Sequence, residues 1–133
     1  MPADRFLDTN ILVYALAQDD PRSAVAEAVL AEGGLVSVQV LNEFVSVGRK
    51  LGLTWDEIGI ALGAIRALVE KPLPLTVETH EAAVGLAAAH GLSIYDALIV
   101  AAAVGAGAAV LYSEDMQHGR RFGPTLVQDP FAA

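Results

Sequence analysis

The chain has 133 residues, of which 54% are hydrophobic and 6% aromatic, and eight Lys and Arg against sixteen Asp and Glu give a net charge of -8. A chain of this length and apolar content fits one folded domain, which we expect to span residues 1–133, and argues against disorder. The negative charge argues against a protein that coats duplex DNA with a broad basic surface, and the absence of cysteine excludes thiol catalysis, disulfides and cysteine-ligated zinc.

Apolar spacing, capping residues and Gly or Pro stops divide the chain into short alternating elements. In chain order they predict strand 5–7, helix 9–17, helix 21–32, strand 35–38, helix 39–50, helix 54–70, strand 73–75, helix 76–90, helix 94–104, strand 108–112 and strand 125–127. Pro21 suits a first helical position, and Pro74 places its strand at a sheet edge because proline cannot donate a ladder hydrogen bond. The alternation predicts an α/β domain with a mostly parallel sheet.

The run from 97 to 113 carries no charged residue. It is shorter than the ~20 residues that a bilayer span needs, so we predict a buried helix followed by a buried strand, and no membrane association. The first eight residues lack the basic start and apolar stretch of a signal peptide. We therefore expect a cytoplasmic location.

Four acidic residues interrupt mostly apolar segments, namely Asp8, Glu43, Asp96 and Asp115. Asp8 and Asp115 follow predicted strands, at the sheet edge where parallel α/β folds bind ligands. A carboxylate removed from water is costly unless a positive charge compensates it. The pattern therefore suggests a shared divalent cation, and hard oxygen ligands favour Mg²⁺ or Mn²⁺ over zinc.

Each acid also has a purely structural interpretation. Asp8 can cap the helix that follows it, and Asp96 can complete a capping box with Ser93. Asp115 suits an ordinary turn, and Glu43 can be a solvated surface residue beside the apolar face of its helix. These alternatives stay open, because capping and metal binding can coexist.

Four stretches together carry a family resemblance, namely residues 6–14, 42–44, 93–99 and 111–116. They resemble the motifs of the PIN-domain family, in particular VapC-type toxins, and the resemblance extends over nearly the whole chain to residues 129–131. It implies a three-layer α/β/α sandwich with a five-stranded, mostly parallel sheet of order 3-2-1-4-5. It also implies a Mg²⁺- or Mn²⁺-dependent endoribonuclease that cleaves RNA, a small cognate antitoxin and a homodimer.

The resemblance further assigns roles to seven residues. The catalytic acids and metal ligands are Asp8, Glu43, Asp96 and Asp115, and the polar residues that support the metal are Thr9, Asn10 and Ser113. Asp8 and Asp96 would be the main ligands, while Asp115 and Glu43 would hold a second ion or position water. In this hypothesis a metal-activated water cleaves the phosphodiester and no protein nucleophile is needed.

Basic residues near the acids are weaker predictions. Lys50, Arg120 and Arg121 can contact phosphates or be ordinary solvated charges. His118 can transfer protons three residues after Asp115, although a surface histidine is the preferred interpretation.

Three other functions compete with a toxin nuclease. A phosphatase with Asp8 as nucleophile would want a second acid two residues on, where the chain has Asn10, and a receiver domain would want a late lysine, yet none follows Lys71. A metal-binding scaffold without catalysis remains open. A PIN nuclease that processes RNA without acting as a toxin also remains open.

Overall fold

The computed structural model describes residues 2–17 and 19–132. After a 3-10 turn at Pro2–Asp4, the helices are α1 (Thr9–Leu16), α2 (Ser23–Ala31), α3 (Val38–Lys50), α4 (Trp55–Leu68), α5 (Val77–His90) and α6 (Ile94–Gly105). The strands are β1 (Arg5–Leu7), β2 (Val110–Tyr112), β3 (Arg121–Phe122) and β4 (Thr125–Gln128). All six predicted helices are therefore present, with shifts of one or two residues at most ends.

The strands form one sheet of order β1-β2-β4-β3. β1, β2 and β4 are parallel, and their register aligns Phe6, Leu111 and Val127 in one fully buried row. β3 pairs antiparallel with the outer side of β4 as a short hairpin that the sequence pattern did not predict. The α/β fold with a mostly parallel sheet is confirmed, although the number of strands differs from five.

The two predicted strands at 35–38 and 73–75 are reduced to single bridges. Phe6 bridges Leu35, and Ser37 bridges Leu73, both in parallel orientation. The first segment is cut short because Ser37 caps α3 by accepting the amide hydrogen of Val40, so Val38 is already helical. The backbone still follows the expected order, with Leu73 outermost, then Leu35 to Ser37, β1, β2 and β4.

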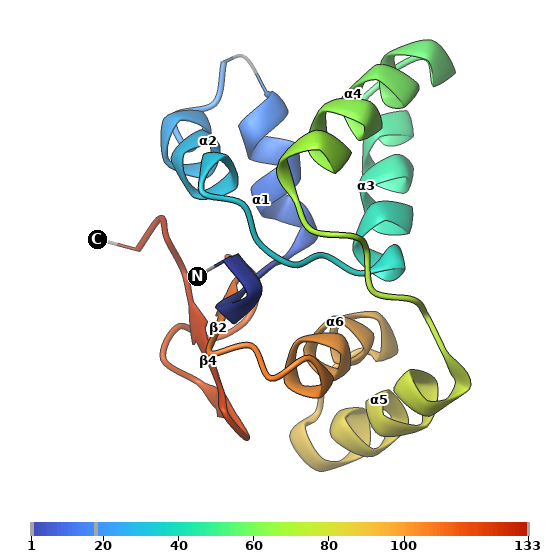
Figure 1. Cartoon of the computed structure of the whole chain (residues 1–133), viewed down its shortest axis with the longest axis vertical. Coiled ribbons are helices and arrows are strands. Elements are labelled where there is room, and N and C mark those ends of the chain that lie inside the picture. Colours follow the sequence, from blue (N-terminus) through green and yellow to red (C-terminus); the bar gives the residue numbers. More distant parts are fainter. Residues whose placement is uncertain (1, 18, 133) are drawn as a thin grey trace.

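Helices cover both faces of this sheet (Figure 1). α1 packs against α2 and α3, and α4 packs against α3, on one side of the strands. α5 and α6 form a pair on the other side, where Gly91 ends α5 with a φ of 68°. This arrangement confirms the predicted three-layer architecture, and α2 begins at Ser23 instead of Pro21.

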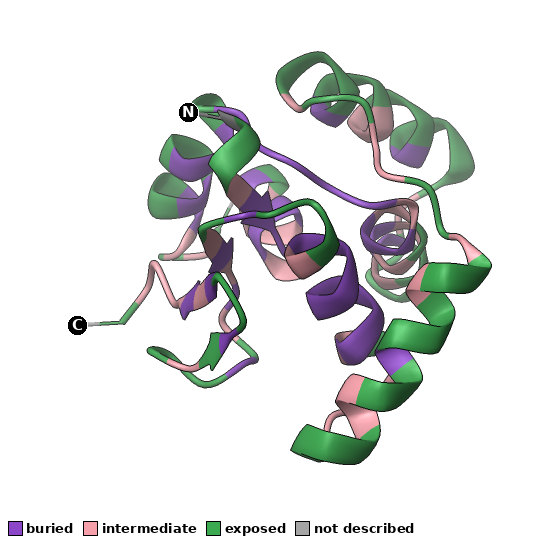
Figure 2. Cartoon of the chain, turned by 60° about the horizontal axis from the view of Figure 1, so that its bottom comes forward, coloured by how far each residue is buried: buried purple, intermediate pink, exposed green. Residues whose placement is uncertain are grey.

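α6 is the most buried helix among the described residues. Its seven consecutive buried residues are Ala97, Leu98, Ile99, Val100, Ala101, Ala102 and Ala103 (Figure 2). The small alanine side chains let α6 pack closely between α5 and the sheet, as the uncharged run predicted. Over the part of the chain that the structure describes, no single helix is long and apolar enough to cross a bilayer; α5 and α6 pass that test only as a pair bent by 115°.

Candidate active site

Asp8 lies where β1 ends and α1 begins, and its side chain is only 4% exposed. Its Oδ1 accepts the amide hydrogen of Thr9 at 2.7 Å, and its Oδ2 accepts the hydroxyl hydrogen of Ser113 at 2.7 Å. Its own amide donates to the carbonyl oxygen of Tyr112 at 3.0 Å. Asp8 therefore does cap α1, and it is also fixed to the end of the neighbouring strand.

Burial raises the pKa of the Asp8 carboxyl from 3.8 to about 7. The hydrogen bonds from Ser113 and Thr9 oppose this shift, while the negative charges of Asp115 and Asp96 add to it. A carboxyl with this pKa binds a proton near neutral pH unless a cation replaces that proton. Among the residues that the structure describes, no Lys, Arg or His forms an ion pair with this buried acid.

Glu43 and Asp96 reach this region from two helices. Glu43 is half-buried on α3 and accepts a hydrogen bond of 3.0 Å from the Gln39 side chain. Burial is the main cause that raises its pKa, and the charges of Asp96 and Asp115 add to the shift. Asp96 lies in the first turn of α6, where burial and then Asp115 raise its pKa and hydrogen bonding with Ser93 lowers it.

Asp115 is exposed in the loop after β2, and its charge acts on all three other acids. Asp115 therefore lies within electrostatic reach of the other three predicted acids, and Asp96 lies within reach of both Asp8 and Glu43. Within residues 2–17 and 19–132, however, no three His, Asp or Glu side chains lie close enough to form a metal-binding group. The charges of these acids therefore affect one another's pKa, but in the described part of the chain their side chains do not form a ready-made metal-binding group.

The polar residues after Asp8 have unsatisfied atoms. Thr9 Oγ1 and both amide atoms of Asn10 are buried and make no hydrogen bond within the described part of the chain. Buried polar atoms normally have partners, so each such atom needs an explanation. Their oxygens, together with the carboxylates, are the hard donors that Mg²⁺ and Mn²⁺ prefer. The residues present fit such an ion by donor chemistry.

Comparison with known protein families identifies the family of this chain. Residues 5–121 match the sequence profile of the PIN domain. This chain belongs to the PIN-domain family. No curated protein sequence matches the chain.

Two solved structures resemble this PIN domain. VapC20 of Mycobacterium tuberculosis, a sarcin-ricin loop cleaving toxin, has a TM-score of 0.69 and 24% identity, over 84% of this chain and 89% of that one. VapBC2 of Rickettsia felis, bound to a DNA fragment from its promoter, has a TM-score of 0.68 and 19% identity, over 93% and 96% of the two chains. At these identities the likeness shows a shared fold.

The sequence pattern missed a polar cluster beside the acids of this PIN domain. Glu114 accepts a 2.6 Å hydrogen bond from the Tyr14 hydroxyl and two hydrogen bonds, of 3.0 and 2.9 Å, from Nη1 of Arg22. Tyr14 belongs to the first family-like stretch and Glu114 to the last. Their 100-residue separation along the chain gives no local signal of the contact.

The predicted basic residues are dispersed around this PIN domain. Lys50 and Arg121 are exposed, and Arg120 donates to the carbonyl oxygen of His90 at 3.1 Å. His118 is exposed too, and its Nδ1 accepts the amide hydrogen of Asp129 at 3.0 Å. Their contacts with phosphates stay predictions.

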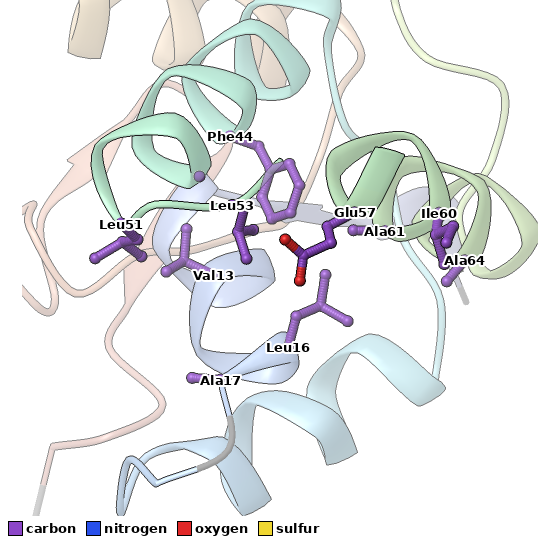
Figure 3. A pocket seen from close by; sticks show the side chains of 11 residues that line it. Val13, Leu16, Ala17, Phe44, Leu51, Leu53, Glu57, Ile60, Ala61 and Ala64 are labelled. Carbon is purple, nitrogen blue, oxygen red and sulfur yellow. The ribbon is translucent and has the colours of Figure 1, made fainter. Parts of the chain in front are cut away.

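An apolar groove of about 680 Å³ lies between α1, α3 and α4 of the PIN domain (Figure 3). Its lining includes Val13, Leu16, Phe44, Leu51 and Ile60. None of the four acids is part of this lining, although Phe44 follows Glu43 directly in α3. The groove and the acidic site are therefore separate features.

Proposed function

We propose that this PIN domain is a divalent-metal-dependent endoribonuclease and the toxin of a toxin–antitoxin pair. The observation that carries the proposal is the buried Asp8 at the carboxyl ends of the parallel strands, within electrostatic reach of Asp96 and Asp115. Family membership supports the nuclease, and the shared fold of VapC20, a sarcin-ricin loop cleaving toxin, supports the toxin. RNA in the cytoplasm is the proposed substrate.

Asp8 and Asp96 would hold the ion, with Asp115 and Glu43 holding a second ion or positioning water. When bound, Mg²⁺ or Mn²⁺ supplies an activated water and neutralises charge on the phosphate. The chain's own groups orient the acids: Ser113 and the Thr9 amide fix Asp8. Gln39 likewise holds Glu43. Thr9 and Asn10 add the unpaired oxygens described above.

The test is cleavage of a mixed single-stranded RNA by the purified chain with Mg²⁺ or Mn²⁺, beside EDTA. Asp8→Asn and Asp96→Asn should each abolish metal-dependent cleavage. Asp56→Asn is the matched control, because Asp56 is an exposed acid in the first turn of α4. Cleavage that survives both site variants would contradict the assignment, and metal binding without cleavage would favour a scaffold.

The apolar groove supports a proposed partner. Leu16, Leu51 and Ile60 are 41%, 68% and 75% exposed, so a partner that covers them would remove apolar surface from water. Glu57 also lines the groove, so its charge favours a partner segment that carries a basic residue beside its apolar face. The proposed occupant is a segment of the cognate antitoxin, as a partner of the toxin described above. A homodimer is part of the same proposal, and sedimentation of the purified chain tests it.

A further inference from the structure

Glu114 is adjacent to Asp115 in sequence, and its side chain is held by Tyr14 and Arg22. Its Oε1 accepts hydrogen bonds from the Tyr14 hydroxyl and from Arg22, and its Oε2 accepts a second one from Arg22. These contacts connect the loop after β2 to α1 and to the residue that precedes α2. Two neighbouring acids therefore have different surroundings: Glu114 has a cationic partner, and Asp115 acts on the acidic site.

Arg22 is itself held in place. Asp20 accepts hydrogen bonds of 2.9 Å from its backbone amide, from Nε and from Nη2. The guanidinium lies 3.9 Å from the centre of the Tyr14 ring, and Phe131 contacts that ring edge-on at 5.4 Å. A planar guanidinium that binds two carboxylates and stacks on an aromatic ring has little freedom to move. Each of its three guanidinium nitrogens already donates to a carboxylate, so Arg22 is poorly suited to binding a phosphate.

The residue on the other side of Glu114 is fixed as well. The Ser113 amide donates to the carbonyl oxygen of Gln128 at 3.1 Å, and its hydroxyl donates to Asp8. The same hydroxyl accepts the amide hydrogen of Met116 at 3.3 Å. Residues 113, 114 and 116 are thus each held by a hydrogen bond, and Asp115 lies between them.

We propose that Tyr14 and Arg22 are positioning residues that, by holding Glu114, fix the orientation of Asp115 toward the acidic site. The same contacts keep the Glu114 carboxylate from entering that site as a fifth negative charge. This inference rests on the proposed metal-dependent function, since it assigns Asp115 a role in holding the ion. Neither Tyr14 nor Arg22 touches substrate or metal in this scheme.

The experiment measures Mn²⁺ binding by calorimetry on the full chain, together with the kinetics of RNA cleavage. Arg22→Gln should weaken Mn²⁺ binding about 10-fold, the usual order for a residue that orients a ligand, and lower kcat while the KM for RNA stays unchanged. Tyr14→Phe keeps the ring and loses only the hydroxyl, so it is the variant least exposed to misfolding. Its effect and that of Glu114→Gln should be non-additive in the double variant, because both remove one shared hydrogen bond.

Arg49→Gln is the matched control. Arg49 also stacks on an aromatic ring, 4.7 Å from the centre of Trp55, and donates to the carbonyl oxygen of Leu53 at 2.9 Å. It should leave Mn²⁺ affinity unchanged.

Two results would overturn the inference while the nuclease proposal stands. One is a wild-type Mn²⁺ affinity in Arg22→Gln and Tyr14→Phe with only a lower melting temperature, which would make the cluster purely structural. The other is a raised KM for RNA with unchanged Mn²⁺ affinity, which would make Arg22 a substrate contact. A wild-type chain that binds no Mn²⁺ would instead overturn both proposals.

Discussion

The hydroxyl of Ser113 donates a 2.7 Å hydrogen bond to Oδ2 of Asp8, across 105 residues of chain. The two residues follow β2 and β1, which are neighbours in the sheet. The bond stabilises the ionised form of Asp8 and thereby opposes the rise in pKa that burial causes. Because the bond forms only when β1 and β2 are paired, the pairing of these strands affects the pKa of Asp8.

Ser113→Ala should therefore raise the pKa of Asp8 above its present value of about 7. We expect the activity–pH profile to move to higher pH and stability to fall by about 1–3 kcal/mol, since a buried acceptor loses a partner. The measurement is metal-dependent cleavage from pH 6 to pH 9, with urea unfolding alongside. Ser23→Ala is the control, because the Ser23 hydroxyl donates to a carbonyl oxygen of Ala17 at 3.0 Å. An unshifted profile in Ser113→Ala would remove this role from Ser113.

Without a divalent ion, stability should fall as pH rises toward 7. The folded state holds the Asp8 proton more tightly than the unfolded state, because the pKa of Asp8 is about 7 when folded and 3.8 as reference. Between these values the slope is up to about 1.4 kcal/mol per pH unit, and the loss is complete above the folded pKa. Asp8→Asn should flatten this slope in urea unfolding with EDTA. Equal slopes in the two proteins would show that Asp8 ionises freely.

Two glycines should respond in opposite directions to alanine. Gly34 has a φ of 154°, and an added Cβ would lie 3.1 Å from the carbonyl oxygen of Arg5, so Gly34→Ala should destabilise by about 1–3 kcal/mol. Gly63 lies in α4, where an added Cβ would meet nothing within 4 Å. Gly63→Ala should therefore stabilise by about 0.5–1 kcal/mol. Thermal unfolding measures both, and a neutral Gly34→Ala would mean that the segment at β1 adapts to a side chain.

The groove makes a prediction about binding. Ile60→Asp should weaken binding of the antitoxin, taken as the protein encoded beside this chain, by at least about 10-fold, because a charge would be buried against an apolar segment. Val77→Asp is the control, since Val77 is a similarly exposed apolar residue on α5. Calorimetry with the purified partner gives both affinities. An equal loss of affinity in the two variants, or no loss in Ile60→Asp, would mean that the antitoxin binds outside the groove.

Local signals predicted most of the helices correctly. The Thr54–Glu57 capping box is formed with both hydrogen bonds, and Ser93 caps α6 as expected. Local signals failed where two structures competed for the same residues. Ser37 fits the middle of a strand, but its side chain caps α3, so the segment makes only isolated bridges, at Leu35 and at Ser37. Pro21 suits a helix start, yet Asp20 and Arg22 form a turn there and α2 begins at Ser23.

The candidate site was predictable only in part. The four acids followed from strand ends and apolar surroundings, and the fold places Asp96 and Asp115 within electrostatic reach of both Asp8 and Glu43. Their metal-binding roles stay predictions. The contact of Tyr14 and Arg22 with Glu114 was not predictable, because it depends on how α1 and the turn before α2 lie against the loop after β2. Sequence spacing carries no information about such a contact.

The strand ends at the site are tied together by backbone hydrogen bonds, from Asp8 to Tyr112 and from Ser113 to Gln128. Amide hydrogens held in this way, next to the buried row of β1, β2 and β4, exchange with deuterium only when a large part of the structure opens. The amides of Asp8 and Ser113 should accordingly be among the slowest to exchange, and those of the more exposed α4 much faster. In molecules in which α4 has locally unfolded, the strand ends that position Asp8 and Ser113 would then still be folded.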